Sequence, residues 1–276
     1  MQNIIVLTIP ISLFLSQYLA KKYPNNYLLD IRDHSPLLSI SIFKRWFNKE
    51  LANAGIVAIS SKGFKNWLPE NIQYVVSHNV SQNLLQTNIT CNNNHFTQPI
   101  RILTAGLMIR YDCNVRVIQD FANKNEYELA FVGEGPMGKP LLDYCTQNSI
   151  KNVKFEGRYE KQDEGKIYLD SSIVNIFLPR TLNSDTCMSN RFYNSVVYRR
   201  PMIVNEGSYQ AELVSGFGLG LVLSETDNFY DKVTEYWKSI DWTMYIHNCA
   251  SFLEMVKNEN DIFIENVKAF LKNENN

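Results

Sequence analysis

The chain has 276 residues, of which 45% are hydrophobic and 20% are charged, a composition typical of a globular protein. Its net charge of −1 at pH 7 provides no basic field, which argues against a nucleic acid partner. Five dispersed cysteines without a Cys-x-x-Cys pair argue against a disulfide framework and favour a reducing, cytoplasmic setting. The four histidines show no metal-ligand spacing, so no metal site is predicted.

The first 15 residues are apolar but do not match a targeting segment. They lack a basic start and a small-residue cleavage site, Pro10 interrupts them, and the run is too short to span a membrane. We expect a buried strand followed by a helix here.

Strands and helices then alternate through residues 1–80. Strands are predicted at residues 4–8, 27–31, 56–60 and 74–77, and helices at 12–21, 40–54 and 63–67. This alternation predicts a parallel sheet with helices on both faces. The polar, asparagine-rich residues 81–98 are expected to form a linker.

The alternation resumes after the linker and predicts a second, complete domain over residues 99–276. Strands are expected at 100–105, 128–132, 153–156, 173–178, 202–204 and 219–223, with helices between them. Three helices, at 227–238, 242–257 and 261–272, would form a C-terminal tail. The predicted fold class is therefore α/β with two Rossmann-like domains, whose ligands bind beyond the carboxyl ends of the strands.

Glycines follow two strands of the second domain. Gly133, Glu134 and Gly135 lie between a strand and a helix, a geometry that can present backbone N–H groups to a phosphate. Gly106 and Arg110 follow the domain's first strand, where Arg110 could pair with an anion. A glycine turn alone more often only turns the chain. Gly135→Val is expected to abolish nucleotide binding and to leave the fold largely intact.

Polar residues also follow two later strands of this domain. Asn190, Arg191 and Asn194 lie in the first turns of a predicted helix, and Glu212 follows another strand end. Helix starts favour anions, although an ordinary cap by Ser189 is the alternative interpretation. Because several such features meet at one sheet edge, the sequence favours a nucleotide-type ligand.

The first domain has two candidate regions. Arg32 and Asp33 end its second strand, where they could face a ligand, or where Arg32 could pair with Asp30 while Asp33 or Ser35 starts a helix. Both interpretations stay open. Residues 43–49, from Phe43 to Lys49, combine cations and aromatics on one helix, which suits either an anionic membrane surface or exposed charges beside core aromatics.

Several segments resemble motifs of one enzyme family. Residues 131–136 (FVGEGP) and 152–157 (NVKFEG) resemble the VGxGP and NVxFxG pair of GT-B glycosyltransferases of family four, retaining enzymes of bacterial polysaccharide synthesis. Residues 190–201 resemble the family's NKLxE…GxP segment, and residues 29–33 its strand-end E-x-R-D. The resemblance covers nearly the whole chain and is most specific in the second domain.

The resemblance implies transfer of a hexose or N-acetylhexosamine from a UDP- or GDP-sugar to a glycan or lipid-linked glycan at the inner face of the membrane. No cofactor besides the donor is implied. Arg32 and Asp33 become the catalytic candidates on the acceptor side. The donor-binding candidates are Gly106, Arg110, Gly133, Glu134, Gly135, Asn190, Arg191, Asn194 and Glu212.

Two departures from the family pattern leave alternatives open. The family's paired glutamates align near Thr186 and Asn194, and neither is a carboxylate. Met1 aligns with the family's fourth strand, so we expect an incomplete first domain with an exposed apolar edge. The chain could thus be an inactive or split subunit that needs a complementary chain. An epimerase would need more acid–base groups, and a dehydrogenase a third glycine in register.

Overall fold

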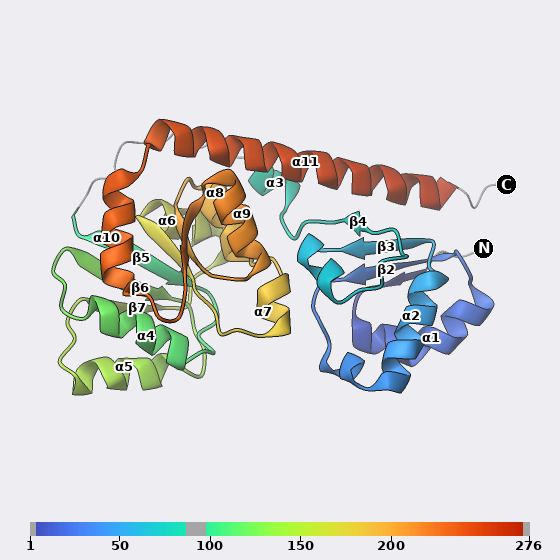
Figure 1. Ribbon diagram of the computed structural model, residues 1–276, viewed down its shortest axis with the longest axis horizontal. Helices are drawn as coiled ribbons and strands as arrows, with labels where there is room; N and C mark the ends of the chain where they lie inside the picture. Colours follow the sequence, from blue (N-terminus) through green and yellow to red (C-terminus); the bar gives the residue numbers. More distant parts are fainter. Residues whose placement is uncertain (1–3, 87–97, 273–276) are drawn as a thin grey trace. The chain divides into compact units, whose positions relative to one another are not determined.

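The computed structural model describes residues 4–86 and 98–272. It contains two compact units, each built on one parallel sheet (Figure 1). Unit 1 comprises Met1–Asn79, Thr181–Met188 and Glu254–Asn276, and unit 2 comprises Val80–Arg180 and Ser189–Leu253. This division differs from the predicted one, because two segments of the second half pack in unit 1. Part of the predicted linker, residues 87–97, lies outside the described residues.

Unit 1 has a four-stranded parallel sheet in the order β1-β2-β3-β4. The strands are β1 (Ile4–Val6), β2 (Tyr27–Ile31), β3 (Ile56–Ile59) and β4 (Val75–Val76). Helices α1 (Ile9–Lys22) and α2 (Ser41–Ala52) cover one face, where Leu13 and Phe47 pack on Leu29 and Val57. Short helices η1 (Pro36–Ser39), η2 (Lys62–Asn66) and α7 (Leu182–Thr186) follow the strand ends or join the unit from the second half of the chain.

The strand β1 lies at the edge of this sheet, paired only with β2 among the described strands. Its Ile5 side chain is 59% exposed. This agrees with the predicted exposed apolar edge.

Unit 2 has a six-stranded parallel sheet in the order β10-β9-β8-β5-β6-β7. The strands are β5 (Ile100–Ala105), β6 (Tyr127–Val132), β7 (Val153–Gly157), β8 (Ile173–Ile176), β9 (Met202–Asn205) and β10 (Gly220–Leu223). The helices are α3 (Gln82–Leu85), α4 (Asp112–Phe121), α5 (Gly138–Gln147), η4 (Lys161–Asp163), α6 (Glu164–Leu169), α8 (Asn190–Val197), α9 (Tyr209–Phe217), α10 (Phe229–Ser239) and the first part of α11 (Trp242–Lys272). From the central β5, the chain winds outward first to β7 and then, through β8, to β10. The predicted α/β fold class with two parallel sheets is confirmed.

The prediction of two separate helices at residues 242–257 and 261–272 is wrong. They form one unbroken helix, α11 (Trp242–Lys272) (Figure 1). No glycine or proline lies at the expected break between the two helices. The side chains at this point of α11 also contact residues of unit 1. Glu259 binds His78 and Lys62 at 2.8 and 2.5 Å, and Asn260 Oδ1 accepts from the His78 backbone N–H at 2.9 Å. The end of α11 then covers the second face of the unit 1 sheet through Phe263, Val267 and Phe270.

A second difference is a short helix, α7, which the sequence analysis did not predict. Thr181 and Ser184 form a reciprocal capping box that starts α7. Thr186 accepts a hydrogen bond from Trp67 Nε1 at 3.2 Å, and its carbonyl accepts from Ser61 Oγ at 2.5 Å. These bonds bring the segment into unit 1.

Helix α2 contains residues 43–49, the predicted membrane contact. Phe47 is only 2% exposed, and Phe43 and Trp46 are partly buried against the same core. Lys44 and Arg45 are exposed. The alternative interpretation, exposed charges beside core aromatics, therefore describes α2. Among the described residues, no helix is both long and apolar enough to cross a membrane.

Candidate functional site

A cavity of about 520 Å³ opens at the carboxyl edge of the unit 2 sheet. Its lining residues follow three strands: Ile109, Arg110, Tyr111, Asp112, Cys113 and Arg116 come after β5, Phe177 and Pro179 after β8, and Glu225 after β10. β5 and β8 are neighbours from which the chain winds in opposite directions. Open α/β sheets leave a ligand crevice at such a switch point. We refer to this cavity as the switch-point pocket.

The switch-point pocket combines flat apolar walls with cations. Tyr111, Phe177 and Pro179 supply the apolar part. Arg116 is held in place, since it pairs with Asp120 and donates to the Asp227 carbonyl at 2.7 Å. The pocket therefore suits a ligand that has both a flat ring and an anionic group.

Arg191 carries a positive charge behind the same pocket. Its guanidinium lies 3.4 Å from the Asn175 carbonyl, and no carboxylate of the described part of the chain forms an ion pair with it. Burial lowers its pKa, which reflects the cost of keeping this cation from water. Burial likewise raises the pKa of the Cys113 thiol, whereas the nearby charges of Arg110 and Arg191 lower it. The charges of two guanidinium groups thus both act on one pocket-lining thiol, and an anionic ligand would compensate them.

The predicted glycine turn packs against the loop that follows β5. A Cβ atom at Gly133 would lie 2.1 Å from the Gly106 carbonyl oxygen, and one at Gly135 would lie 2.3 Å from the Met108 carbonyl oxygen. Backbone bonds join the two loops, with the Met108 N–H donating to the Glu134 carbonyl at 2.9 Å. The expectation that a side chain at Gly135 leaves the fold intact is therefore wrong. The phosphate contact of Gly106, Gly133, Glu134 and Gly135 stays a prediction.

The structure separates the other donor-binding candidates. Ser189 caps α8, accepting from the Arg191 N–H at 3.2 Å, as the alternative interpretation expected. Asn190 is exposed in the first turn of α8, and Glu212 is exposed in the first turn of α9; neither lines the switch-point pocket. Asn194 is 3% exposed, and its side chain hydrogen-bonds the buried Tyr168 hydroxyl. A contact between Asn194 and a ribose stays a prediction. The hydrogen bond between Asn194 and Tyr168 would compete with that contact.

Asn194→Ala is expected to lower the free energy of unfolding by roughly 1–3 kcal/mol, because it leaves the buried Tyr168 hydroxyl without this partner. Chemical denaturation measures the loss. Tyr168→Phe with Asn194→Ala should recover part of it, since the orphaned hydroxyl is then gone. Equal stability of Asn194→Ala and the parent chain would contradict a structural role.

In unit 1, the two catalytic candidates differ in their surroundings. Arg32 pairs with Asp30 at 2.7 Å and donates to the Ser77 carbonyl at 3.0 Å, so it ties the ends of β2 and β4 together. Asp33 is exposed and accepts from Asn183 Nδ2 at 3.3 Å. The pairing of Arg32 with Asp30 matches the structural interpretation. The catalytic role of Arg32 and Asp33 stays a prediction.

A smaller cavity of about 230 Å³ lies beside these residues in unit 1. Trp67 and His34 line it, with the His34 ring edge-on to Trp67 at 5.1 Å between centroids. Burial lowers the pKa of His34, which favours its neutral form. Lys44 and Leu182 are among the other residues that line this cavity.

Sequence reasoning missed much of the switch-point pocket, notably Tyr111, Phe177 and Glu225. These residues stand next to strand ends, but only the strand order places β8 and β5 side by side. Among the residues that the structure describes, no group of His, Cys, Asp and Glu side chains could hold a metal ion.

Solved structures match this fold although few of their residues are identical to those of this chain. The Anabaena protein Alr3699/HepE in complex with UDP matches with a TM-score of 0.72 and 13% identity, over 97% of this chain and 79% of that one. Sucrose-phosphate synthase from Thermosynechococcus elongatus matches with a TM-score of 0.72 and 11% identity, over 98% of this chain and 74% of that one. The lipopolysaccharide outer core galactosyltransferase WaaB matches with a TM-score of 0.62 and 12% identity, over 95% of this chain and 80% of that one. The chain thus has the fold of GT-B glycosyltransferases. No protein-family model matches it, and no curated protein matches it in sequence.

Proposed function

We propose that the chain is a glycosyltransferase that binds a nucleotide sugar of the UDP or GDP type in the switch-point pocket. The observation that carries this proposal is the crevice where the strand order reverses, which Arg110, Tyr111 and Phe177 line. The charge of Arg191 also acts on the Cys113 thiol of this pocket. Structures with this fold have been solved with UDP, which supports the choice of ligand.

Each part of the pocket would have a separate task. Tyr111 and Phe177 would pack against the base, and the two arginines would hold the diphosphate. Positive charge at the diphosphate stabilises the nucleoside diphosphate as it leaves, when its bond to the sugar breaks and the acceptor oxygen forms the new glycosidic bond. The protein would otherwise position the substrates, and a diphosphate oxygen would take up the acceptor proton in a retaining transfer of the family-four type.

We further propose a glycan or lipid-linked glycan as the acceptor, in the synthesis of a capsule or lipopolysaccharide at the cytoplasmic face of the membrane. The transferred group would be a hexose or an N-acetylhexosamine. Asp33, which is exposed at the carboxyl end of β2, is the acceptor-side candidate. The likeness to a galactosyltransferase of the lipopolysaccharide outer core supports this direction.

A second candidate function is a nucleotide-sugar-binding subunit without turnover that pairs with a complementary chain. The observation that favours it is the missing carboxylate pair: Thr186 is buried in unit 1, and Asn194 is bonded to Tyr168. Both functions require donor binding, but only the first requires transfer or hydrolysis of the sugar.

Arg191→Met is expected to weaken UDP binding about 10- to 100-fold, since a charge-assisted hydrogen bond contributes roughly 1.5–3 kcal/mol. Arg110→Ala should have a similar effect. Isothermal titration calorimetry with UDP measures both, and Arg45→Ala, an exposed arginine of unit 1, is the charge control. Unchanged affinity in both pocket variants would place the nucleotide elsewhere. Hydrolysis of UDP-glucose and UDP-N-acetylglucosamine then separates an enzyme from a binding subunit.

A further inference from the structure

A second cavity of unit 2, of about 530 Å³, lies at the end of the sheet opposite to the switch-point pocket. Its lining residues belong to three neighbouring strands: Pro99 precedes β5, Asn123 and Asn125 precede β6, Ser149, Lys151 and Asn152 precede β7, and Tyr127, Glu128 and Lys154 lie in β6 and β7. Because the strands are parallel, these residues share the amino edge of the sheet. The six residues of β5 separate this edge from the carboxyl edge by roughly 20 Å. We call this cavity the amino-edge pocket.

Two asparagines hold the walls of the amino-edge pocket in place. Asn152 Nδ2 donates to three backbone carbonyls, of which that of Phe121 is the closest, at 2.8 Å. Asn152 Oδ1 accepts from the Asn123 backbone N–H at 2.9 Å. Asn123 Oδ1 in turn accepts from the Lys151 backbone N–H at 3.0 Å. The loops before β6 and β7 are therefore bonded into one frame, and the side chains that they carry start from fixed backbone positions.

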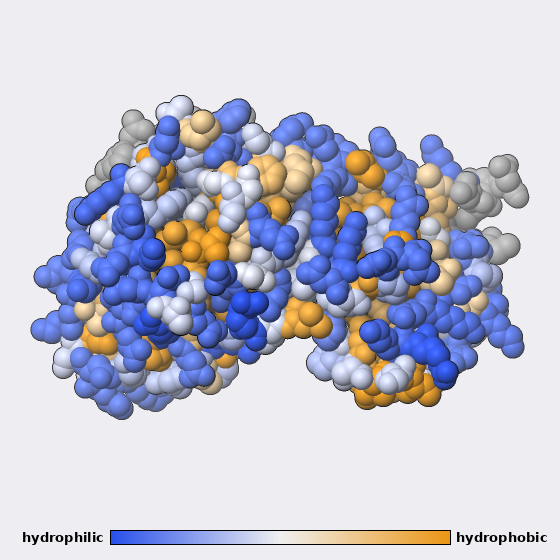
Figure 2. All heavy atoms as spheres, viewed as in Figure 1, coloured by the Kyte–Doolittle hydropathy of each residue, from blue (hydrophilic) through white to orange (hydrophobic). Residues whose placement is uncertain are grey.

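Three polar side chains on this frame are unused. Asn125, Ser149 and Lys151 are exposed, and their side chains form no hydrogen bond or ion pair with the residues that the structure describes. They offer an amide, a hydroxyl and an ammonium group, which together can donate and accept hydrogen bonds. Figure 2 shows mainly hydrophilic residues along the left edge of unit 2, where the chain passes from α4 to β6. The amino-edge pocket therefore suits a ligand with several polar groups.

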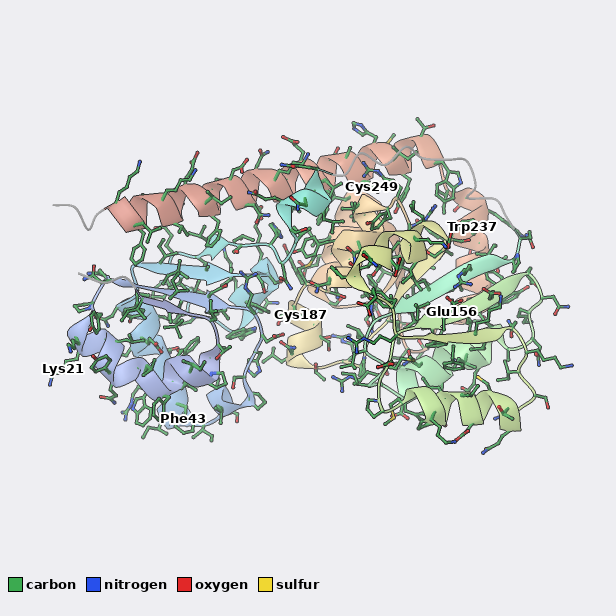
Figure 3. The ribbon with its side chains drawn as sticks, turned by 180° about the vertical axis from the view of Figure 1, so that it is seen from behind. Lys21, Phe43, Glu156, Cys187, Trp237 and Cys249 are labelled. Atoms are coloured by element: carbon green, nitrogen blue, oxygen red, sulfur yellow. The ribbon has the colours of Figure 1, made fainter. Side chains whose placement is uncertain are left out.

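The amino-edge pocket also carries an excess of positive charge. Glu128 is the one carboxylate among its described lining residues, and it pairs with Lys154 at 2.5 Å and with Arg101. Arg101 also pairs with Glu156 on β7 (Figure 3). Since two cations already share Glu128, the charge of Lys151 is left uncompensated in a chain whose net charge is −1. A ligand with acidic groups would compensate this charge.

We propose that the amino-edge pocket binds an acidic glycan, a saccharide chain that carries carboxylate or phosphate groups. Lys151 pairs with an acidic group, and the Asn125 amide and the Ser149 hydroxyl bond to sugar hydroxyls. The pocket lies too far from the switch-point pocket for its ligand to be the sugar that is transferred. It holds a distant part of a glycan chain instead, so that long chains bind more tightly than short ones.

The size and lining of the pocket favour a saccharide over other anions. A cavity of about 530 Å³ has the volume of a site for an organic ligand and is much larger than a single phosphate ion. A single-stranded nucleic acid would stack its bases on exposed aromatic rings, but Tyr127, the one aromatic among the described lining residues, is 1% exposed. A protein partner would need large apolar anchors, and the described lining residues offer only Pro99.

The saccharide nature of the ligand rests on the proposed function, because a glycosyltransferase meets glycan chains, whereas the acidic groups follow from the charges of the pocket. The binding itself uses no residue of the switch-point pocket. A failure of glycan binding and a failure of UDP binding can therefore be observed separately.

The test is isothermal titration calorimetry of the full chain with two acidic oligosaccharides, hyaluronan and oligogalacturonate, with neutral maltooctaose, and with inorganic phosphate. We expect at least one acidic oligosaccharide to bind, with an affinity that falls as salt is added, and maltooctaose to bind at least about fivefold more weakly. Lys151→Ala should weaken acidic glycan binding about fivefold. Asn125→Ala with Ser149→Ala should weaken it by about fivefold for each hydrogen bond lost.

Lys166→Ala is the matched control, because Lys166 is exposed on α6 in unit 2 and does not line the amino-edge pocket. Thermal unfolding of Lys151→Ala should match that of the parent chain, since the side chain is exposed. Failure of both acidic oligosaccharides to bind at low salt would overturn the proposal. So would binding that Lys151→Ala leaves unchanged, binding that is lost with Arg110→Ala in the switch-point pocket, or phosphate binding that excludes both oligosaccharides.

Discussion

Gly135→Ala is expected to destabilise the protein by about 3 kcal/mol, although it adds one methyl group. The new Cβ would lie 2.3 Å from the Met108 carbonyl oxygen and 2.6 Å from its nitrogen. Both are backbone atoms of the adjoining loop, so no side-chain rotation can relieve the contact. The backbone φ of +157° at Gly135 adds strain for any other residue. Urea denaturation measures the loss as a lower midpoint.

Gly216→Ala provides the matched control for this prediction. Gly216 lies in α9, and a Cβ atom there meets nothing within 4 Å. Alanine should therefore stabilise this helix, by up to about 1 kcal/mol. If Gly135→Ala were as stable as the parent, the loop after β5 could not lie where the structure places it. Arg191→Met then remains the cleaner test of nucleotide binding, because it leaves this loop contact untouched.

Much of the fold could be predicted from the order of apolar runs. The strands β2 and β5 match their predicted bounds, because strands of parallel sheets are buried on both faces and are therefore continuously apolar. The segments that the prediction missed lack such a pattern. The α7 segment is polar, and it is helical because a capping box starts it and unit 1 holds its end.

The candidate site was predictable only in part, and the reason is geometric. Glycines and arginines after strands could be found in the sequence, because strand ends can be predicted. Which strand ends meet depends on strand order, and so Phe177 and Tyr111 remained unassigned. Some polar residues were assigned to the site on their residue type alone. Asn194 and Arg32 could both bind a ligand, yet in the structure they contact Tyr168 and Asp30.

The protein is expected to lose stability as pH rises from about 4.5 to about 7, because of Glu50. This carboxylate is fully buried between α1 and α2, where one oxygen accepts from Ser12 Oγ at 2.5 Å and the other has no partner among the described residues. Burial raises its pKa to about 7, against an ordinary value near 4.5. The folded state thus holds a proton that the unfolded chain releases, and the resulting stability is complete below pH 4.5 and lost as pH passes 7.

Glu50→Gln should remove this pH dependence. The shift of the Glu50 pKa corresponds to about 3 kcal/mol of unfolding free energy between pH 4.5 and pH 7. At pH 8, Glu50→Gln should therefore be more stable than the parent chain by up to about that amount, less the cost of one unpaired amide N–H. The measurement is the difference in unfolding free energy between variant and parent at several pH values, which cancels the contributions of His34 and other shared groups. Glu70→Gln, at an exposed position of unit 1, should show a flat difference. A flat difference for Glu50→Gln as well would mean that Glu50 is ionised and solvated in the folded protein, and that α1 and α2 do not pack as the structure shows.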